Sequence, residues 1–172
     1  SQALTENAFT RDGYLLVGWN TNPDGSGTSY QDLEEVKNLT SKDGGVVTLY
    51  AQWLANAYYV QFDGNGADQG FMGRQAMAYD KETSILANAF SKEGYHFKHW
   101  TTNPDGTGKV YGDQDLVVNL VAEDGKSVTL YAQWEANQYT VSYQKNAGNV
   151  VGTMENSQFK YDVAGTLREN AY

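Results

Sequence analysis

The stretch Val128-Thr129-Leu130-Tyr131-Ala132-Gln133-Trp134 decides the fold of this chain, because the same seven residues already occur at positions 47–53. Its apolar residues alternate with Thr, Tyr and Gln, which is the period-2 pattern of a strand with one buried face. Comparing residues 1–57 with residues 82–138, position by position, gives 28 identities in 57 positions. The chain therefore contains an internal repeat of about 81 residues.

The repeat divides the chain into three segments. Residues 1–57 are the C-terminal part of a first repeat, residues 58–138 are a complete repeat, and residues 139–172 are the N-terminal part of a third. The return strand predicted near 71–79 recurs at an offset of 82, because one residue has been inserted in the turn near 147–152. We expect the chain to be a piece of a longer protein built from such units.

The composition excludes several classes of function. The chain has 172 residues, a net charge of −9 and no Cys, so it can form neither disulfides nor thiolate metal sites. The acidic balance argues against a nucleic-acid partner, which would require a basic face. No apolar run approaches the roughly 18 residues of a membrane span. We expect no cofactor and no bound metal.

Each complete repeat is predicted to be a small sheet crossed by one short helix. Residues 13–19 and 58–62 have strand periodicity, and 63–66 form a hairpin turn. Leu33, Val36 and Leu39 are three residues apart, and Asp32 with Glu35 resembles a capping box, so a helix is predicted over 32–39 and again after Asp113. The predicted fold class is α+β, mostly β.

The sequence Asn22-Pro23-Asp24-Gly25 is typical of a type I turn, since Pro presets φ at its second position and Gly suits the fourth. Its spacing with Asn20 also resembles the start of a calcium loop. Position 12 of such a loop is Gln31 instead of a bidentate Glu, so a turn is the preferred interpretation.

The positions shared by the copies are those that build turns and cores. We expect Trp53 and Trp134 to be largely buried, because each lies on the apolar face of its strand. The structural repeat positions are Trp19, Pro23, Gly25, Tyr50, Trp53, Trp100, Pro104, Gly106, Tyr131 and Trp134.

Taken together, these residues resemble the Listeria–Bacteroides repeat family, which includes the B repeats of internalin B. The resemblance rests on the aromatic strand 58–62, the turn 63–66, Gly94-Tyr95-x-Phe97-x-x-Trp100, residues 103–108 and the closing 130–134. It implies β-grasp-like modules in tandem within large secreted or cell-wall-attached bacterial proteins, without enzymatic activity. His99 in place of Gly18, and the long segment 111–127, are departures from the pattern.

The function expected from these observations is structural. The chain has no nucleophile paired with a base, and His96 and His99 are not repeated, so neither a triad nor a metal site is predicted. We expect a stalk or spacer of a bacterial surface protein, packed against neighbouring repeats of the same chain and able to contact a host or matrix protein.

Two alternatives remain open at this point. Tyr50, Tyr59 and Tyr131 are predicted on outer strand faces, where exposed rings could stack on sugars, so a carbohydrate-binding module is the second hypothesis. An accessory domain of an enzyme is the third. The two partial repeats also lead us to expect head-to-tail self-association, or a poorly ordered terminal half, because each would expose an unpaired strand edge.

Overall fold

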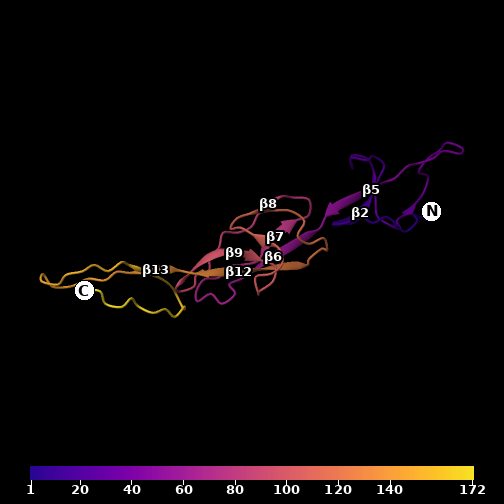
Figure 1. Cartoon of the computed structure of the whole chain (residues 1–172). Coiled ribbons are helices and arrows are strands. Elements are labelled where there is room, and N and C mark those ends of the chain that lie inside the picture. Colours follow the sequence, from indigo (N-terminus) through magenta and orange to yellow (C-terminus); the bar gives the residue numbers. More distant parts are fainter. The chain divides into compact units, whose positions relative to one another are not determined.

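The computed structural model describes residues 1–172, and it consists of strands, turns and loops without any helix (Figure 1). Antiparallel pairing dominates, and most strands are short. The fourteen strands are β1 (Gln2–Ala3), β2 (Tyr14–Asn20), β3 (Ser29–Tyr30), β4 (Glu35–Val36), β5 (Tyr50–Ala55), β6 (Ala57–Asp63), β7 (Gln75–Ala78), β8 (Thr83–Ser84), β9 (Tyr95–Thr101), β10 (Val110–Tyr111), β11 (Leu116–Val117), β12 (Ser127–Ala136), β13 (Gln138–Val141) and β14 (Ser157–Lys160).

The predicted α+β class, with a short helix crossing each sheet, is therefore wrong. Leu33 and Asn38 have φ values of 60° and 56°, and Gln114 and Asn119 have 60° and 54° in the second copy. A residue in the left-handed region cannot continue a right-handed helix. Between these turns the chain forms β4, which pairs with β1, and β11, which pairs with β8. The three-residue spacing of apolar side chains thus reflects turns around a two-residue strand.

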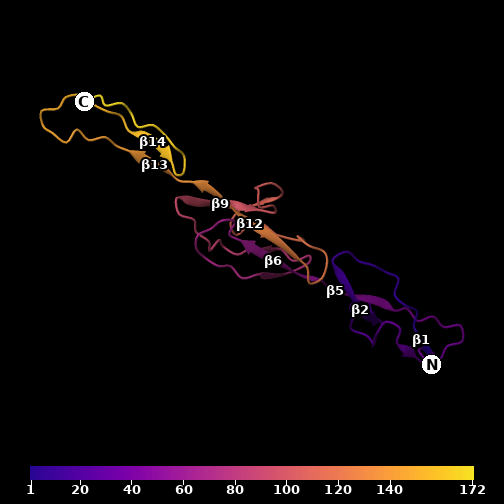
Figure 2. The same ribbon diagram turned by 90° about the horizontal axis from the view of Figure 1, so that it is seen from below.

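A five-stranded sheet contains the organising strand, in the order β10-β9-β12-β6-β7. β12 is antiparallel to β9, with Ala132 opposite Trp100, and a register shift follows Gln133. β6 is antiparallel to β7, with Tyr58 opposite Met77. Figure 2 shows β9, β12 and β6 near one another, in agreement with this order.

β6 and β12 run in the same direction, although their flanking partners are antiparallel. The Gly125 N–H donates to the Ala57 oxygen at 2.7 Å, and the Tyr59 N–H donates to the Lys126 oxygen at 2.9 Å. Residue numbers therefore increase together along the two strands. The long connection from β6 to β12 is the crossover that a parallel pair requires, and turns and short strands supply it.

The partial copies form the corresponding pieces of this sheet. The first copy has a three-stranded sheet in the order β3-β2-β5, and the third copy has the hairpin β13-β14. The short pairs β1-β4 and β11-β8 form two further two-stranded sheets. The same sequence pattern has thus produced the same pairing wherever both strands are present.

The chain separates into two compact units that do not coincide with the sequence repeats. The first comprises Ser1–Val60, Arg74–Ile85 and Leu116–Val128, and the second comprises Gln61–Gly73, Leu86–Asp115 and Thr129–Tyr172. The buried hydrophobic residues of the first unit are Tyr58, Val60, Met77, Ile85 and Val117. The buried hydrophobic residues of the second unit are Met72, Trp100, Leu130 and Ala132.

Candidate functional site: the joint between successive repeats

A single residue, Asn137, separates β12 from β13, and both of its backbone groups are bound. Its N–H donates to the Gly94 oxygen at 2.8 Å, and its carbonyl accepts the Tyr161 N–H at 2.9 Å. Its side-chain oxygen lies 2.9 Å from Nδ1 of His96. The passage from one repeat to the next is therefore a hydrogen-bonded part of the fold.

Two tyrosines and an aspartate close this passage. The rings of Tyr95 and Tyr161 meet edge to face with centroids 5.8 Å apart, and the Tyr95 hydroxyl donates to Oδ2 of Asp162 at 3.0 Å. Gly94 has φ of +76°, and a Cβ built there would overlap the Tyr161 ring. Glycine is required at this position both for its backbone conformation and for the close approach of the ring.

The same arrangement occurs one repeat earlier, within the first unit. The Asn56 N–H donates to the Gly13 oxygen at 2.8 Å, and the Tyr79 N–H donates to the Asn56 oxygen at 2.9 Å. The rings of Tyr14 and Tyr79 are 6.0 Å apart, and the Tyr14 hydroxyl donates to Asp80 at 2.7 Å. We call this set of Gly, two Tyr, Asp and the linking Asn the tyrosine joint.

The first tyrosine joint has additional hydrogen bonds from the loop after β11. The Asn56 side chain donates to the Ala122 oxygen at 2.7 Å, and the Ala57 N–H donates to Oδ1 of Asp124 at 2.9 Å. Asn119 both accepts from the Asp80 N–H at 2.6 Å and donates to the Asp80 carboxylate at 2.7 Å. The loop that replaces the predicted helix thus secures the joint.

These hydrogen bonds change the acidities of the groups involved. The bond from Asn119, followed by that from Tyr14, lowers the pKa of Asp80 below its ordinary value. The bond to Asp80 raises the pKa of Tyr14, and the bond to Asp162 raises the pKa of Tyr95. Hydrogen bonds to a carboxylate favour its charged form, so the first joint is built around an ionised Asp80.

The sequence reasoning missed the tyrosine joint, although a signal for it is present. The dipeptide Tyr79-Asp80 recurs as Tyr161-Asp162, and Gly13-Tyr14 recurs as Gly94-Tyr95. Both pairs were attributed to strands and turns of one repeat. Contact between them depends on the strand continuing through Asn56 or Asn137, which the repeat pattern does not reveal.

The tryptophans among the structural repeat positions differ in burial. Trp100 is completely buried, whereas Trp19, Trp53 and Trp134 are partly buried. The Trp134 indole N–H donates to the Gly64 oxygen at 2.9 Å, and that of Trp19 donates to Asp32 at 3.0 Å. Trp53 and Trp134 are thus mostly but not completely buried, and a loop holds the edge of the Trp134 ring.

The Asn-Pro-Asp-Gly segments form exposed turns in both copies. Pro23 and Pro104 are exposed, and the Gly25 and Gly106 N–H groups donate to Asn22 and Asn103 at 3.1 and 3.2 Å. Ser26 donates to Asp24, and this bond holds the pKa of the Asp24 carboxyl below its ordinary value. The side-chain amide of the buried Asn20 donates to the Gly25 oxygen at 3.1 Å. The aspartate and Asn20 thus bind the turn itself.

The three tyrosines considered for sugar binding lie in different surroundings. Tyr50, on β5, is 40% exposed. Tyr59, on β6, is half-buried, and the Arg74 guanidinium stands 4.1 Å above its ring. Tyr131, on β12, is half-buried. The first unit has a groove lined by residues 10–14, 56, 122 and 123. Neither Tyr50 nor Tyr59 lines this groove.

Comparison with known proteins agrees with the repeat pattern. The model of the Listeria-Bacteroides repeat domain matches residues 1–52 and 58–133. A protein of Evansella cellulosilytica, predicted to be a Gly-rich membrane protein, is 39% identical over 149 residues, covering 86% of this chain and 17% of that protein. A second protein of the same organism, also predicted to be a membrane protein, is 34% identical over 134 residues, covering 77% of this chain and 18% of its own length.

The chain spans less than a fifth of either relative. Within the chain itself, the structure has no helix of the length and apolar character needed to cross a membrane.

Proposed function

Because the chain belongs to the Listeria-Bacteroides repeat family, we propose that it is a non-catalytic tandem-repeat segment of a bacterial cell-surface protein and serves as a spacer. The relatives, predicted to be membrane proteins, support a location at the cell envelope. The chain's own repeated residues support a structural role, since those that recur build turns, strands and joints.

The observation that carries this proposal is the tyrosine joint. A flexible tether would need only exposed polar residues between the repeats, as Gly- and Ser-rich linkers have. Here one linking residue has both backbone groups hydrogen-bonded, and a Tyr–Tyr contact with a Tyr–Asp bond lies beside it. Such a joint transmits orientation and load from one repeat to the next, which is the property that a spacer requires.

The proposal is tested by measuring how tightly the first joint is held. Cysteines replace the exposed Thr28 and Glu82, which lie on either side of the first joint, and carry spin labels whose separation is measured by pulsed electron resonance. We expect one narrow distance distribution for the labelled parent and a broad one after Gly13→Ala, because the new Cβ overlaps the Tyr79 ring.

Gly44→Ala is the matched control for this experiment. Gly44 has φ of +66°, close to the +72° of Gly13, but no atom lies within 4 Å of its added Cβ. The control separates backbone strain from disruption of the joint. A broad distribution in the parent, or equal broadening in both variants, would contradict a stiff spacer.

Adhesion to a host or matrix protein extends this proposal, and carbohydrate binding is the alternative. The exposed ring of Tyr50 is the observation that favours sugar binding. A glycan array and matrix-coated wells, probed with the parent and with Tyr50→Ala, distinguish the two. Glycan binding lost in the variant supports the alternative, and matrix binding retained in it supports adhesion.

A further inference from the structure

Both tyrosine joints bring two tyrosine rings from successive repeats into contact. The centroids of Tyr14 and Tyr79 are 6.0 Å apart with an interplanar angle of 75°, and those of Tyr95 and Tyr161 are 5.8 Å apart with an angle of 76°. This is the edge-to-face arrangement that aromatic pairs prefer. The pairing recurs with nearly the same geometry, so each joint holds two phenols where they can react with each other.

In the first joint, both phenols donate to carboxylates. The Tyr14 hydroxyl donates to Oδ2 of Asp80 at 2.7 Å, and the Tyr79 hydroxyl donates to Oδ2 of Asp12 at 3.2 Å. A phenol loses an electron most easily when its proton leaves at the same time, because the oxidised phenol is a strong acid. The bond from Asn119 holds the pKa of Asp80 below its ordinary value, so this carboxylate carries no proton at neutral pH. Each phenol of the pair therefore has a base in place to receive its proton.

A cation stands over one ring of each pair. The Arg11 guanidinium lies 3.5 Å above the Tyr14 ring, and the Lys92 ammonium lies 4.6 Å above the Tyr95 ring. The cation opposes a positive charge on the ring below it, but it does not oppose a neutral radical. Electron loss from these rings must therefore be coupled to proton loss. Tyr95, like Tyr14, has a carboxylate for this purpose, since its hydroxyl donates to Asp162 at 3.0 Å.

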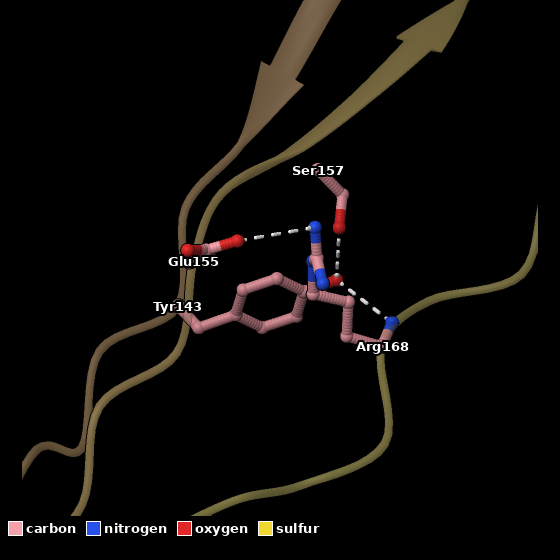
Figure 3. A network of polar contacts seen from close by, with 4 residues as sticks. All are labelled: Tyr143, Glu155, Ser157 and Arg168. Carbon is pink, nitrogen blue, oxygen red and sulfur yellow. Dashed lines mark hydrogen bonds and ion pairs between the residues drawn. The ribbon is translucent and has the colours of Figure 1, made fainter.

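The surroundings of Tyr143 are different (Figure 3). Its hydroxyl lies 3.1 Å from Oγ of Ser157 and accepts the Arg168 N–H at 3.0 Å. The carboxylate of Glu155 lies 3.8 Å from the Arg168 guanidinium and is paired with it instead of with the phenol. A hydrogen-bonded tyrosine in this chain therefore need not have a carboxylate acceptor, and the tyrosine joint combines such an acceptor with a second phenol.

We propose that the tyrosine joint is a site of covalent modification, where a one-electron oxidant generated from a peroxide couples Tyr14 to Tyr79, and Tyr95 to Tyr161, as dityrosine. Each phenol gives one electron to the oxidant and one proton to its base. The two radicals form a bond between ring carbons next to the hydroxyl-bearing carbons, and the hydrogens on those carbons move to the oxygens and restore the phenols. The two electrons cleave the O–O bond of the peroxide, and two protons convert hydrogen peroxide into two waters.

The new bond would change the mechanics of the joint. It would tie residue 14 to residue 79, so the chain between them could not extend even after the hydrogen bonds of the joint had broken. A link between distant points of a chain also restricts its unfolded state, as a disulfide does. The modification would make the proposed spacer covalently continuous across the joint, but the coupling chemistry does not depend on that function.

The test oxidises the full 172-residue chain in dilute solution with light, ruthenium tris-bipyridine and persulfate. This oxidant is small, and Tyr14, Tyr79 and Tyr95 are half-buried while Tyr161 is 37% exposed. Trypsin then cleaves after Lys and Arg, and mass spectrometry identifies linked peptides. We expect peptide 75–81 linked to 12–37, and peptide 93–98 linked to 161–168, within single molecules. Peptide 127–145 holds three tyrosines and should stay unlinked.

Phenylalanine variants keep each ring but remove the phenol. Tyr79→Phe should lose the first link and keep the second, and Tyr161→Phe should do the reverse. Tyr139→Phe is the matched control, because Tyr139 is 48% exposed and its ring stacks on Phe159, so both links should form as in the parent. Asp80→Asn should reduce the yield of the first link several-fold relative to the second, which serves as an internal standard.

Circular dichroism checks that each variant is folded, and the parent unfolded in urea gives the yields without the joint. The linked parent should also melt at a higher temperature than the unlinked one. Absence of both linked peptides in the folded parent would overturn the proposal. Equal yields in the folded and unfolded chains, or links spread over peptide 127–145, would do so as well, since the joint would then not direct the coupling.

Discussion

Trp100 and Trp19 occupy the same position in two copies of one repeat, yet their surroundings differ. Trp100 is completely buried and contacts the rings of Phe62, Phe90 and Phe97, with centroids 4.9–6.3 Å apart. Trp19 is partly exposed, packs against Phe9 at 6.1 Å and donates its indole N–H to Asp32. The difference shows that the hairpin at the start of a repeat, which supplies Phe62, completes the core around the tryptophan in the middle of that repeat.

The largest expected effect comes from removing the two tryptophans in turn. Trp100→Ala should lower the free energy of unfolding by about 3–5 kcal/mol, because a completely buried aromatic ring leaves a cavity. Trp19→Ala should cost about 1–2 kcal/mol, since part of its ring is already in water. Urea unfolding followed by far-ultraviolet circular dichroism measures both. Equal losses would mean that the hairpin adds little to the core.

The tyrosine joints offer the second comparison, between glycines with similar backbone angles. Gly94→Ala should cost about 2–4 kcal/mol, because it combines a strained φ with overlap on the Tyr161 ring. Gly125→Ala should cost about 1 kcal/mol, since its φ is +70° but its Cβ would meet no atom. Thermal and urea unfolding of the two variants check this. The steric account of the joint fails if both losses are the same.

Acid should weaken the first joint through Asp80. Its pKa in the folded state lies below the unfolded value of about 3.9, so the folded state binds fewer protons between the two values. The stabilisation is therefore present above about pH 4 and is lost as pH falls through the folded pKa. Melting temperatures between about pH 3 and 7 should fall less steeply for Asp80→Asn than for the parent.

Glu82→Gln is the control for the acid experiment, since it removes an exposed carboxylate two residues away. Its melting temperature should follow that of the parent across the range. A parallel change in both variants would point to general charge repulsion in this acidic chain, and away from the joint.

The outer face of the sheet β3-β2-β5 differs in sequence from that of the equivalent strands β10-β9-β12, although the strand order is the same. Leu15 lies opposite Leu54 in the first copy, where both are more than half exposed, whereas the equivalent pair is His96 and Glu135. Exchanging Leu15→His and Leu54→Glu should change the free energy of unfolding by less than about 0.5 kcal/mol. A loss of several times that size, measured by urea unfolding, would show that the leucines are covered in the folded chain.

Calcium should have the smallest effect. A calcium loop around Asn-Pro-Asp-Gly would begin at Asn20 in the first copy and at Thr101 in the second. Both segments lack the closing carboxylate that such a loop requires. Millimolar calcium, compared with chelator, should leave the melting temperature unchanged. An increase in the melting temperature would show that calcium binds the folded state, because a ligand that binds only that state must stabilise it.

Much of the strand pattern could be predicted because strand periodicity is local. The alternation along 128–134 and 58–62 placed Leu130, Ala132, Tyr58 and Val60 on inner faces, and all four are buried. Turn chemistry is equally local, which is why the segment after Asn22 was recognised. The tyrosine joint could not be predicted in this way, since Gly94 and Tyr161 meet only through the continuation of one strand into the next.

The helix was predicted wrongly because a three-residue spacing has more than one physical cause. Leu33 and Leu116 are 53% and 65% exposed, so they do not form the buried stripe of an amphipathic helix. The informative residues were Asn38 and Asn119, which recur at the same offset and adopt left-handed conformations. Asn is among the few residues that tolerate this region, and a repeated Asn there indicates a turn.

The one-residue passage at Asn56 and Asn137 limits how such a chain can evolve. An added residue there would move the Tyr79 or Tyr161 N–H out of reach and turn every following side chain of the strand to the opposite face. The turn near 147–152, in contrast, has accepted an extra residue while the contact between Tyr95 and Tyr161 is kept. Length can therefore vary inside a repeat but not between repeats, and an array of these units grows or shrinks by whole copies.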